Sequence, residues 1–299
     1  MIPYVFLTGF LGTGKTTLLN ALLNQYKGMK IGVIVNDFGD MDVDAALIDA
    51  SALAGEVREL KSGQIFCSCL AGSFVESVLA YREIKPDLLI VECSGLAKPS
   101  GLKDITRAID MKVPGEFTCG GMACLVDGER HMQMEKCLMV LTEQMDASNL
   151  LLVTKTDLLD DAEKQALLQH LSARYPDKQI LLSTRGKIDG DFLSLLTKGN
   201  DAYLDMDTDR FAGWGPQGRP KSFVIQPALK TAQDIYRKLT PYLNRLYRIK
   251  GGVATSDRGA VYVDGTSAGI EVKQAPSTVE SGLVVITHDQ SLEFELAFL

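Results

Sequence analysis

The N-terminal part of the chain contains the stretch Gly9-Phe10-Leu11-Gly12-Thr13-Gly14-Lys15-Thr16, which matches the pattern G-x-x-x-x-G-K-[ST] at every fixed position. The apolar run before it, residues 4–8, is typical of a buried strand, and the pattern over residues 15–25 is typical of a helix. Strand, glycine-rich loop and helix in this order are the context in which this pattern binds phosphates. We therefore predict a phosphate-binding loop at this strand-to-helix turn.

The residue types of this loop indicate its chemistry. Glycines let backbone N–H groups wrap around a phosphate, and the N-terminus of the following helix adds partial positive charge. Lys15 is expected to reach the β- and γ-phosphates, and the hydroxyl of Thr16 is expected to bind Mg²⁺. The nucleotide contacts predicted for this region are Gly9, Gly12, Thr13, Gly14, Lys15, Thr16 and Thr17.

The following sequence predicts an α/β fold with a mostly parallel sheet. Further strand-like apolar stretches occupy residues 31–35, 88–91, 122–126, 150–154 and 179–182. Helical patterns lie between most of them, over residues 74–82, 102–109, 133–145 and 161–174. Apolar strands that alternate with amphipathic helices are typical of βα units, which pair their strands in parallel.

The composition changes near residue 210, where the turn-forming segment 213–220 indicates a linker. A strand over 222–226 and a helix over 231–245 follow, then short strands near 246–253, 260–263, 269–273 and 283–287. Asp264-Gly265 is predicted to form a hairpin turn. We expect a P-loop domain over residues 1–207, a linker over 208–220 and a smaller α+β domain over 221–299.

Composition narrows the class of protein. The chain has 299 residues, of which 46% are hydrophobic and 23% charged, so it can bury a core. No apolar run approaches the roughly 18 residues that span a bilayer, and the first residues lack the basic segment of an export signal. A net charge of −7 argues against nucleic acid as a partner. Six cysteines are too few for a disulfide scaffold, so we expect reduced thiols in the cytoplasm.

The tetrapeptide Thr154-Lys155-Thr156-Asp157 follows a predicted core strand and is similar to the guanine-recognition motif Asn-Lys-x-Asp of GTPases. The carboxylate of Asp157 would accept hydrogen bonds from N1 and N2 of guanine. Adenine lacks this pair of donors and would leave the carboxylate unpaired, so the motif favours GTP over ATP. Thr154 replaces the usual Asn at a supporting position. Residues 183–186, after the next strand, are placed to close over the base edge. The alternative is that 154–157 is an ordinary surface turn.

Two acidic segments follow predicted core strands. In Glu92-Cys93-Ser94-Gly95, the carboxylate of Glu92 is expected to act near Mg²⁺ and the N–H of Gly95 to meet the γ-phosphate. The segment 36–40 follows the second strand at the edge where open α/β sheets bind ligands. Its Asp37 is a candidate to bind Mg²⁺ or to position water, unless the loop is simply a solvated acidic surface. The predicted catalytic set is therefore Lys15, Thr16, Asp37 and Glu92.

Together, the stretches 9–16, 36–40, 92–99 and 154–157 resemble, in order and spacing, the CobW family of metal-trafficking P-loop GTPases. Arg248-Ile249-Lys250-Gly251 is similar to the R-x-K-G signature of that family's C-terminal domain. The resemblance carries family roles onto Lys15, Thr16, Glu92, Thr154, Lys155 and Asp157.

This resemblance implies slow hydrolysis of GTP with Mg²⁺, coupled to delivery of a metal or metal-containing cofactor to a client. The client would be a metalloenzyme or corrinoid protein that the C-terminal domain recognises, and the protein would be a monomer or homodimer without nucleic acid or membrane partners. Two other classes stay open. One is a GTP-gated chaperone or activator of a cobalamin-dependent enzyme that binds no metal itself. The other, a nucleotide-dependent kinase or synthetase, lacks a second-substrate signature.

The chain departs from the family pattern in its cysteines. The family hallmark is G-C-x-C-C, whereas residues 63–69 read Gly-Gln-Ile-Phe-Cys-Ser-Cys. Aligned on Gly63, only Cys67 keeps its place, and Cys69 is extra. Asp37 stands where the family usually has Glu.

Two interpretations are possible for Cys67 and Cys69. In an extended strand Cys67 and Cys69 share a face and offer two thiolates to Zn²⁺ or another transition metal, with Asp37, Asp42 or the client completing the shell. Alternatively, both are buried small residues in an altered loop. The three histidines are scattered without a pair at helical spacing, so the sequence predicts no histidine-based zinc site.

Overall fold

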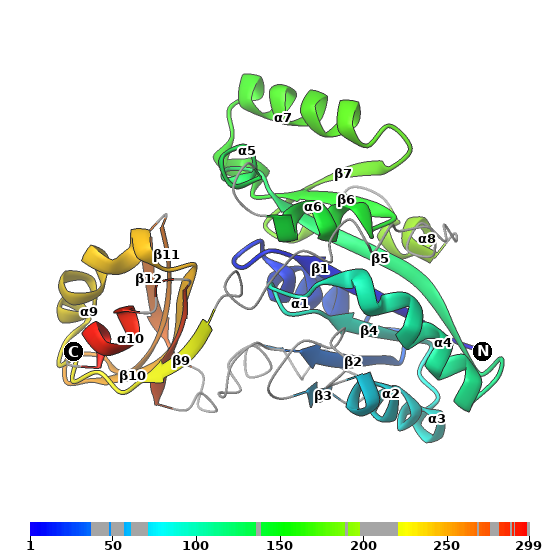
Figure 1. Ribbon diagram of the computed structural model, residues 1–299, viewed down its shortest axis with the longest axis horizontal. Helices are drawn as coiled ribbons and strands as arrows, with labels where there is room; N and C mark the ends of the chain where they lie inside the picture. The colour runs from blue at the N-terminus through cyan, green and yellow to red at the C-terminus, as the bar shows by residue number, and fades with distance from the viewer. Residues whose placement is uncertain are drawn as a thin grey trace. The chain divides into compact units, whose positions relative to one another are not determined.

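The computed structural model describes residues 1–36, 48, 57–60, 71–135, 139–188, 191–197, 221–267, 269–275, 281–287, 289 and 291–297. These residues fall into two compact units, one within 1–197 and one within 221–297 (Figure 1). Each unit has its own sheet and its own core. The predicted boundaries at 207 and 220 lie outside the described residues and stay a prediction. No helix in the described ranges is long and apolar enough to cross a membrane.

The N-terminal unit is built on an eight-stranded sheet, counted over its described residues. The strand order is β3 (Val57–Leu60), β2 (Ile31–Asn36), β4 (Leu88–Glu92), β1 (Ile2–Gly9), β5 (Phe117–Asp127), β6 (Leu150–Thr154), β7 (Gln179–Thr184) and β8 (Lys187–Ile188). All neighbours pair in parallel except β7 and β8. The predicted α/β fold with a mostly parallel sheet is therefore confirmed, with β3 and β8 as strands that the sequence did not predict.

Helices cover both faces of this sheet (Figure 1). They are α1 (Lys15–Gln25), α2 (Ala71–Leu79), α3 (Tyr81–Ile84), α4 (Leu102–Lys112), α5 (His131–Met134), α6 (Met139–Asp146), α7 (Asp161–Arg174) and α8 (Phe192–Thr197). Side chains alternate along the central strand β1, so Tyr4 and Phe6 join the core with α2 and α4, while Val5 and Leu7 join the core with α1 and α8. Burial on both faces explains why β1 is a continuous apolar run.

Two predicted helices are interrupted. The helix expected over 74–82 begins earlier and divides into α2 and α3, and the one expected over 133–145 divides into α5 and α6. By contrast, α1 and α7 have the predicted ends. At the start of α7, Asp160 and Glu163 form a reciprocal capping box, which satisfies two backbone N–H groups and marks the boundary in the sequence.

The C-terminal unit has the predicted α+β character. Its described strands form an antiparallel sheet in the order β12 (Gly269–Gln274), β11 (Gly259–Thr266), β10 (Arg248–Thr255), β13 (Gly282–Thr287) and β9 (Lys221–Ile225). The helix predicted over 231–245 is α9 (Ala232–Leu239) followed by the 3₁₀ turn Thr240–Arg245, and α10 (Ser291–Leu296) follows the last strand. Apolar residues of α9, α10 and the sheet form one core.

The prediction of a hairpin turn at Asp264-Gly265 is wrong. Both residues lie inside β11, and the turn to β12 comes after Thr266. Asp264 accepts two hydrogen bonds from the guanidinium of Arg248, at 3.0 and 2.8 Å. A Cβ at position 265 would lie 2.7 Å from Cγ2 of Ile249, so only glycine fits there. Cross-strand contacts, which local sequence cannot reveal, explain this Asp-Gly pair.

The R-x-K-G signature residues also have structural roles in this unit. Arg248 makes the bidentate pair with Asp264, and Lys250 is almost completely buried. Gly251 has φ +145°, and a Cβ at this position would lie 2.0 Å from the carbonyl oxygen of Gly282. The glycine therefore permits the close pairing of β10 with β13.

Candidate nucleotide site

The phosphate loop joins the central strand β1 to α1. Gly9, Gly12 and Gly14 have φ values of +138°, +74° and +91°, which favour glycine. A Cβ at Gly9 would lie 2.6 Å from the carbonyl oxygen of Leu125 on β5. The glycines of the motif therefore meet a backbone requirement in this loop.

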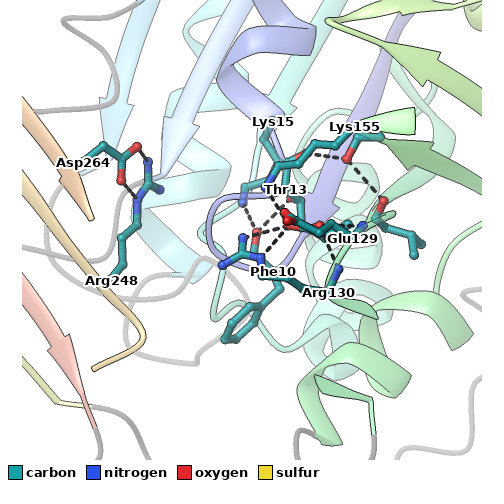
Figure 2. Close-up of polar contacts among 11 residues, drawn as sticks. Phe10, Thr13, Lys15, Glu129, Arg130, Lys155, Arg248 and Asp264 are labelled. Carbon is teal, nitrogen blue, oxygen red and sulfur yellow. Dashed lines mark hydrogen bonds and ion pairs between the residues drawn. The ribbon is translucent and has the colours of Figure 1, made fainter. Parts of the chain in front are cut away.

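Lys15 lies across the loop (Figure 2). Its ammonium donates hydrogen bonds to the carbonyl oxygens of Gly9 at 2.9 Å and Phe10 at 3.0 Å, and the residue is only 7% exposed. The hydroxyl of Thr13 donates to the same Phe10 carbonyl at 2.8 Å. The loop thus holds a positive charge at the place where the sequence predicts phosphate.

Thr16 and Glu92 meet beside this charge. The hydroxyl of Thr16 donates to Oε1 of Glu92 at 2.8 Å, although the two residues are far apart in sequence. Glu92 is the last residue of β4, the neighbour of β1, and is 2% exposed. A hydroxyl and a carboxylate are hard oxygen ligands of the kind that Mg²⁺ prefers, so this pair fits the ion that the motif implies.

Gly95 brings the segment after β4 against the phosphate loop. A Cβ at this position would lie 2.6 Å from Cδ2 and 2.8 Å from the backbone nitrogen of Leu11. The buried side chain of Gln144 donates to the carbonyl oxygens of Gly95 at 3.2 Å and Ala97 at 3.0 Å. Gln144 was not predicted from the sequence, because it lies on α6 with no motif around it.

The hydroxyl of Thr154 connects the end of β6 with the phosphate loop. It lies 2.8 Å from the carbonyl oxygen of Thr13 and 3.2 Å from that of Val126. Since a hydroxyl has one proton, it donates to the nearer Thr13 carbonyl. Threonine in place of the usual asparagine therefore still supplies a donor that ties the two loops together.

Asp127 is a second residue that the sequence analysis missed. It ends β5, and its Oδ2 accepts hydrogen bonds from Lys155 at 2.7 Å and from Arg130 at 3.0 and 2.7 Å (Figure 2). Burial opposes ionisation of Asp127, but the charges of Lys155 and Arg130 outweigh it and lower the pKa of the carboxyl. An acid at the carboxyl end of a core strand was the available signal.

Asp157 borders an open hollow of about 480 Å³ lined by Thr156, Asp157, Lys164, Leu182, Thr184, Arg185 and Lys187. Its Oδ2 accepts a 3.3 Å hydrogen bond from Nε of Arg185, whose side chain is 84% exposed. The hydroxyl of Thr156 lies 2.7 Å from that of Thr184, so the segment after β6 contacts the end of β7. The structure thus brings Asp157 beside residues 183–186, and their role at a base site stays a prediction.

Comparison with known proteins identifies the family. The CobW/HypB/UreG nucleotide-binding domain matches residues 3–182. The chain belongs to this family. It is 30% identical to the zinc chaperone CobW of Sinorhizobium sp, over 68% of this chain and 65% of that protein. It is 32% identical to the zinc chaperone YjiA of Escherichia coli K12, over 68% of this chain and 63% of that protein. The matches thus span somewhat less than two thirds of these relatives.

Among solved structures, the chain is similar to the Zn(II)-bound YjiA GTPase from E. coli, with 21% identity and a TM-score of 0.46. That alignment covers 99% of this chain and 96% of the other.

Several residues that the sequence predicts as metal or Mg²⁺ ligands lie outside the described residues. They are Asp37, Asp42, Cys67 and Cys69, so the cysteine metal site and the Mg²⁺ role of Asp37 stay predictions. Two cysteines that are described lie in the core near the site: Cys93 and Cys124 are both buried and free. Burial raises the pKa of the Cys124 thiol to about 12 and raises that of Cys93 as well. Neither thiol is therefore poised to bind a metal ion.

The histidines correct the sequence analysis. His131 at the start of α5 and His170 on α7 lie together with Glu135, although helical spacing predicted no such pair. A spacing rule detects only residues on one helix, whereas His131 lies on α5 and His170 on α7, and their side chains meet at Glu135.

Proposed function

We propose that this protein binds GTP with Mg²⁺ and hydrolyses GTP to drive delivery of a metal ion, or a metal-containing cofactor, to a client protein. The observation that carries the proposal is the meeting of Lys15, Thr16 and Glu92 at the phosphate loop, on the same sheet edge as the hollow beside Asp157. Membership of the CobW/HypB/UreG family supports it.

In the proposed reaction, Lys15 exchanges the carbonyl oxygens of Gly9 and Phe10 for phosphate oxygens. The interaction of its charge with the β- and γ-phosphate oxygens strengthens as negative charge develops on them in the transition state. The contact therefore lowers the activation barrier for hydrolysis. Thr16 and Glu92 would hold Mg²⁺, which supplies further neutralisation of the phosphates when bound. The N–H of Gly95 would meet the γ-phosphate, in a segment whose carbonyls Gln144 fixes. Hydrolysis is expected to be slow without a partner.

Recognition of guanine would rest on Asp157. Its present contact with Arg185 is long and the guanidinium is well exposed, so little free energy opposes its replacement. The N1 and N2 donors of guanine would donate hydrogen bonds to this carboxylate. Thr156, Thr184 and residues 183–186 would line the base site. The positive φ of Lys155, +56°, sets the turn that aims Asp157 at this hollow.

Zinc is the metal that we favour as cargo, because two relatives of this chain are named zinc chaperones. The C-terminal unit would recognise the client, and the protein would act in the cytoplasm, where its thiols stay reduced. A second candidate is a GTP-gated activator of a corrinoid-dependent enzyme that binds no metal. Gln64 and Phe66 at family cysteine positions favour it.

The test measures hydrolysis and metal transfer together. The zinc-loaded, reduced protein is mixed with a zinc-responsive chelating dye and with GTP, ATP or a non-hydrolysable GTP analogue. We expect phosphate release with GTP and Mg²⁺ only, and faster zinc transfer to the dye with GTP than with the analogue. If the protein hydrolyses GTP but retains no stoichiometric zinc after loading, the result would favour the activator. No hydrolysis of GTP would reject both candidates.

A further inference from the structure

A cluster of nitrogen and oxygen ligands lies between α5 and α7. One ligand atom from each of His131, Glu135 and His170 lies within 4.8 Å of the other two. Nε2 of His170 is 2.6 Å from Oε2 of Glu135, and Nε2 of His131 is 3.6 Å from the same oxygen. Both imidazoles therefore converge on one carboxylate oxygen.

His131 has an unsatisfied atom in this cluster. Its side chain is 2% exposed, and its Nε2 makes no hydrogen bond with any part of the chain that the structure describes. Leaving a buried polar atom unpaired is destabilising, so a ligand at Nε2 would stabilise the cluster.

Arg174 is compatible with a bound ion. Its Nη1 lies 3.1 Å from Oε1 of Glu135, close enough for an ion pair but not aligned as a hydrogen bond. The imidazoles approach the other oxygen, Oε2. A carboxylate that contacts arginine with one oxygen can bind a metal with the second, and the arginine then orients it.

The ligand types select the class of ion. Imidazole nitrogens suit Zn²⁺, Co²⁺, Ni²⁺ and Cu²⁺, whereas Mg²⁺ and Ca²⁺ prefer oxygen alone. Tetrahedral zinc with bonds of about 2.0–2.1 Å needs its ligand atoms roughly 3.4 Å apart. Nε2 of His131 and Oε2 of Glu135 are already close to this separation, whereas Nε2 of His170, at 2.6 Å from the same oxygen, must move outward to admit the ion. His170 is on the outer side, with its side chain 33% exposed, and can make that movement.

We propose that His131, Glu135 and His170 bind one zinc-type divalent ion and leave a fourth position open to water or to another molecule. Three protein ligands with an open position are typical of sites where the metal reacts or is exchanged, and not of closed structural sites. The proposal rests on these contacts alone, independent of residues 63–69 and of GTP hydrolysis.

The test uses the full chain with Cys67→Ser and Cys69→Ser, so that these thiolates cannot contribute. Co²⁺ is titrated into this reduced variant, and its binding is followed by the visible absorption bands of bound Co²⁺. Zinc is then added to compete with Co²⁺ for the same site. We expect one equivalent of Co²⁺ without the near-ultraviolet band of a thiolate ligand. Adding His170→Gln should weaken binding on the order of 100-fold or more, since loss of even an outer-shell partner costs 10–100-fold.

Two controls keep the result interpretable. His288→Gln removes the third histidine of the chain and should leave Co²⁺ binding unchanged. Glu135→Gln keeps the shape of the side chain but removes its charge, and should weaken binding while circular dichroism shows an intact fold. Failure of the Cys67→Ser/Cys69→Ser variant to bind Co²⁺ overturns the proposal, and so does binding that survives His170→Gln. GTP hydrolysis is read separately, so its absence would not count against this site.

Discussion

Lys15 is the residue whose charge the proposed hydrolysis needs most. Its ammonium lies against the carbonyl oxygens of Gly9 and Phe10, at the mouth of the phosphate loop. For Lys15→Ala we expect GTP hydrolysis to fall at least 100-fold, on the order of 3 kcal/mol, because the lost contact strengthens in the transition state. Phosphate release under saturating GTP is the measurement. Lys27→Ala, an exposed lysine just after α1, is the matched control. Parent-like hydrolysis by Lys15→Ala would reject this role.

Asp157 is predicted to select the base. Asp157→Asn replaces two acceptor oxygens with one acceptor and one donor, so nucleotide affinity should move from GTP toward xanthosine triphosphate, which has a carbonyl where guanine has its amine. Competition binding with the three triphosphates measures this change. Asp161→Asn, at a fully exposed carboxylate in the first turn of α7, should change none of the three affinities. The assignment fails if the parent protein binds ATP and GTP equally.

Local sequence predicted some residues of the site better than others. Lys15, Thr16 and the loop glycines are close together in the chain, so their arrangement follows from a local pattern of fixed length. Asp127 and Gln144 carry no such pattern, because their partners are Lys155 and the carbonyls of Gly95 and Ala97, which only the folded sheet brings near. Long-range contacts of this kind also explain why the histidine cluster was missed.

At the scale of elements, the segment after β4 and the phosphate loop touch through Gly95. Gly95→Ala places a methyl group 2.8 Å from the backbone nitrogen of Leu11, so one of the two segments must move. An overlap of this kind costs about 1–3 kcal/mol, and we expect hydrolysis to fall roughly 10- to 100-fold. GDP should still bind, since it lacks the γ-phosphate that the Gly95 N–H would meet. Binding and hydrolysis are measured side by side.

Gly72→Ala on α2 is the control for that variant, because a Cβ there would meet nothing within 4 Å. It should leave hydrolysis unchanged and raise stability slightly, by a few tenths of a kcal/mol. If Gly95→Ala also hydrolyses GTP normally, the close approach of the two segments is not needed for the reaction.

Elements with strong local signals were predicted with the correct ends, and weak ones were missed. The glycine loop defines the start of α1, and the capping box defines that of α7. In contrast, β3 has only four residues, among them Arg58 and Glu59, which give no apolar run. The Asp264-Gly265 pair shows the opposite error, since a true turn signal was overridden by the contacts of Asp264 and Gly265 with β10.

At the scale of the whole molecule, metal binding and nucleotide binding are expected to be coupled. If Cys67 and Cys69 bind zinc with Asp37 or Asp42, a nucleotide that contacts residues 36–40 changes the zinc affinity. By linkage, zinc then changes GTP affinity by the same factor, for a coupling of roughly 1–3 kcal/mol. Zinc titrations with GDP and with a GTP analogue measure it, each for the parent and for Cys67→Ser/Cys69→Ser. Identical weak binding in all four would mean that these cysteines are structural.

The burial of Cys93 and Cys124 should make these two cysteines less reactive toward alkylating reagents than the other cysteines of the chain. Alkylating reagents attack the thiolate, and both core thiols are protonated at neutral pH and shielded from reagent. Of the chain's six cysteines, these two should therefore stay unmodified for as long as the protein is folded. Mass spectrometry of the intact protein would then follow the labelling of the other four cysteines and report how a bound ion or nucleotide protects them.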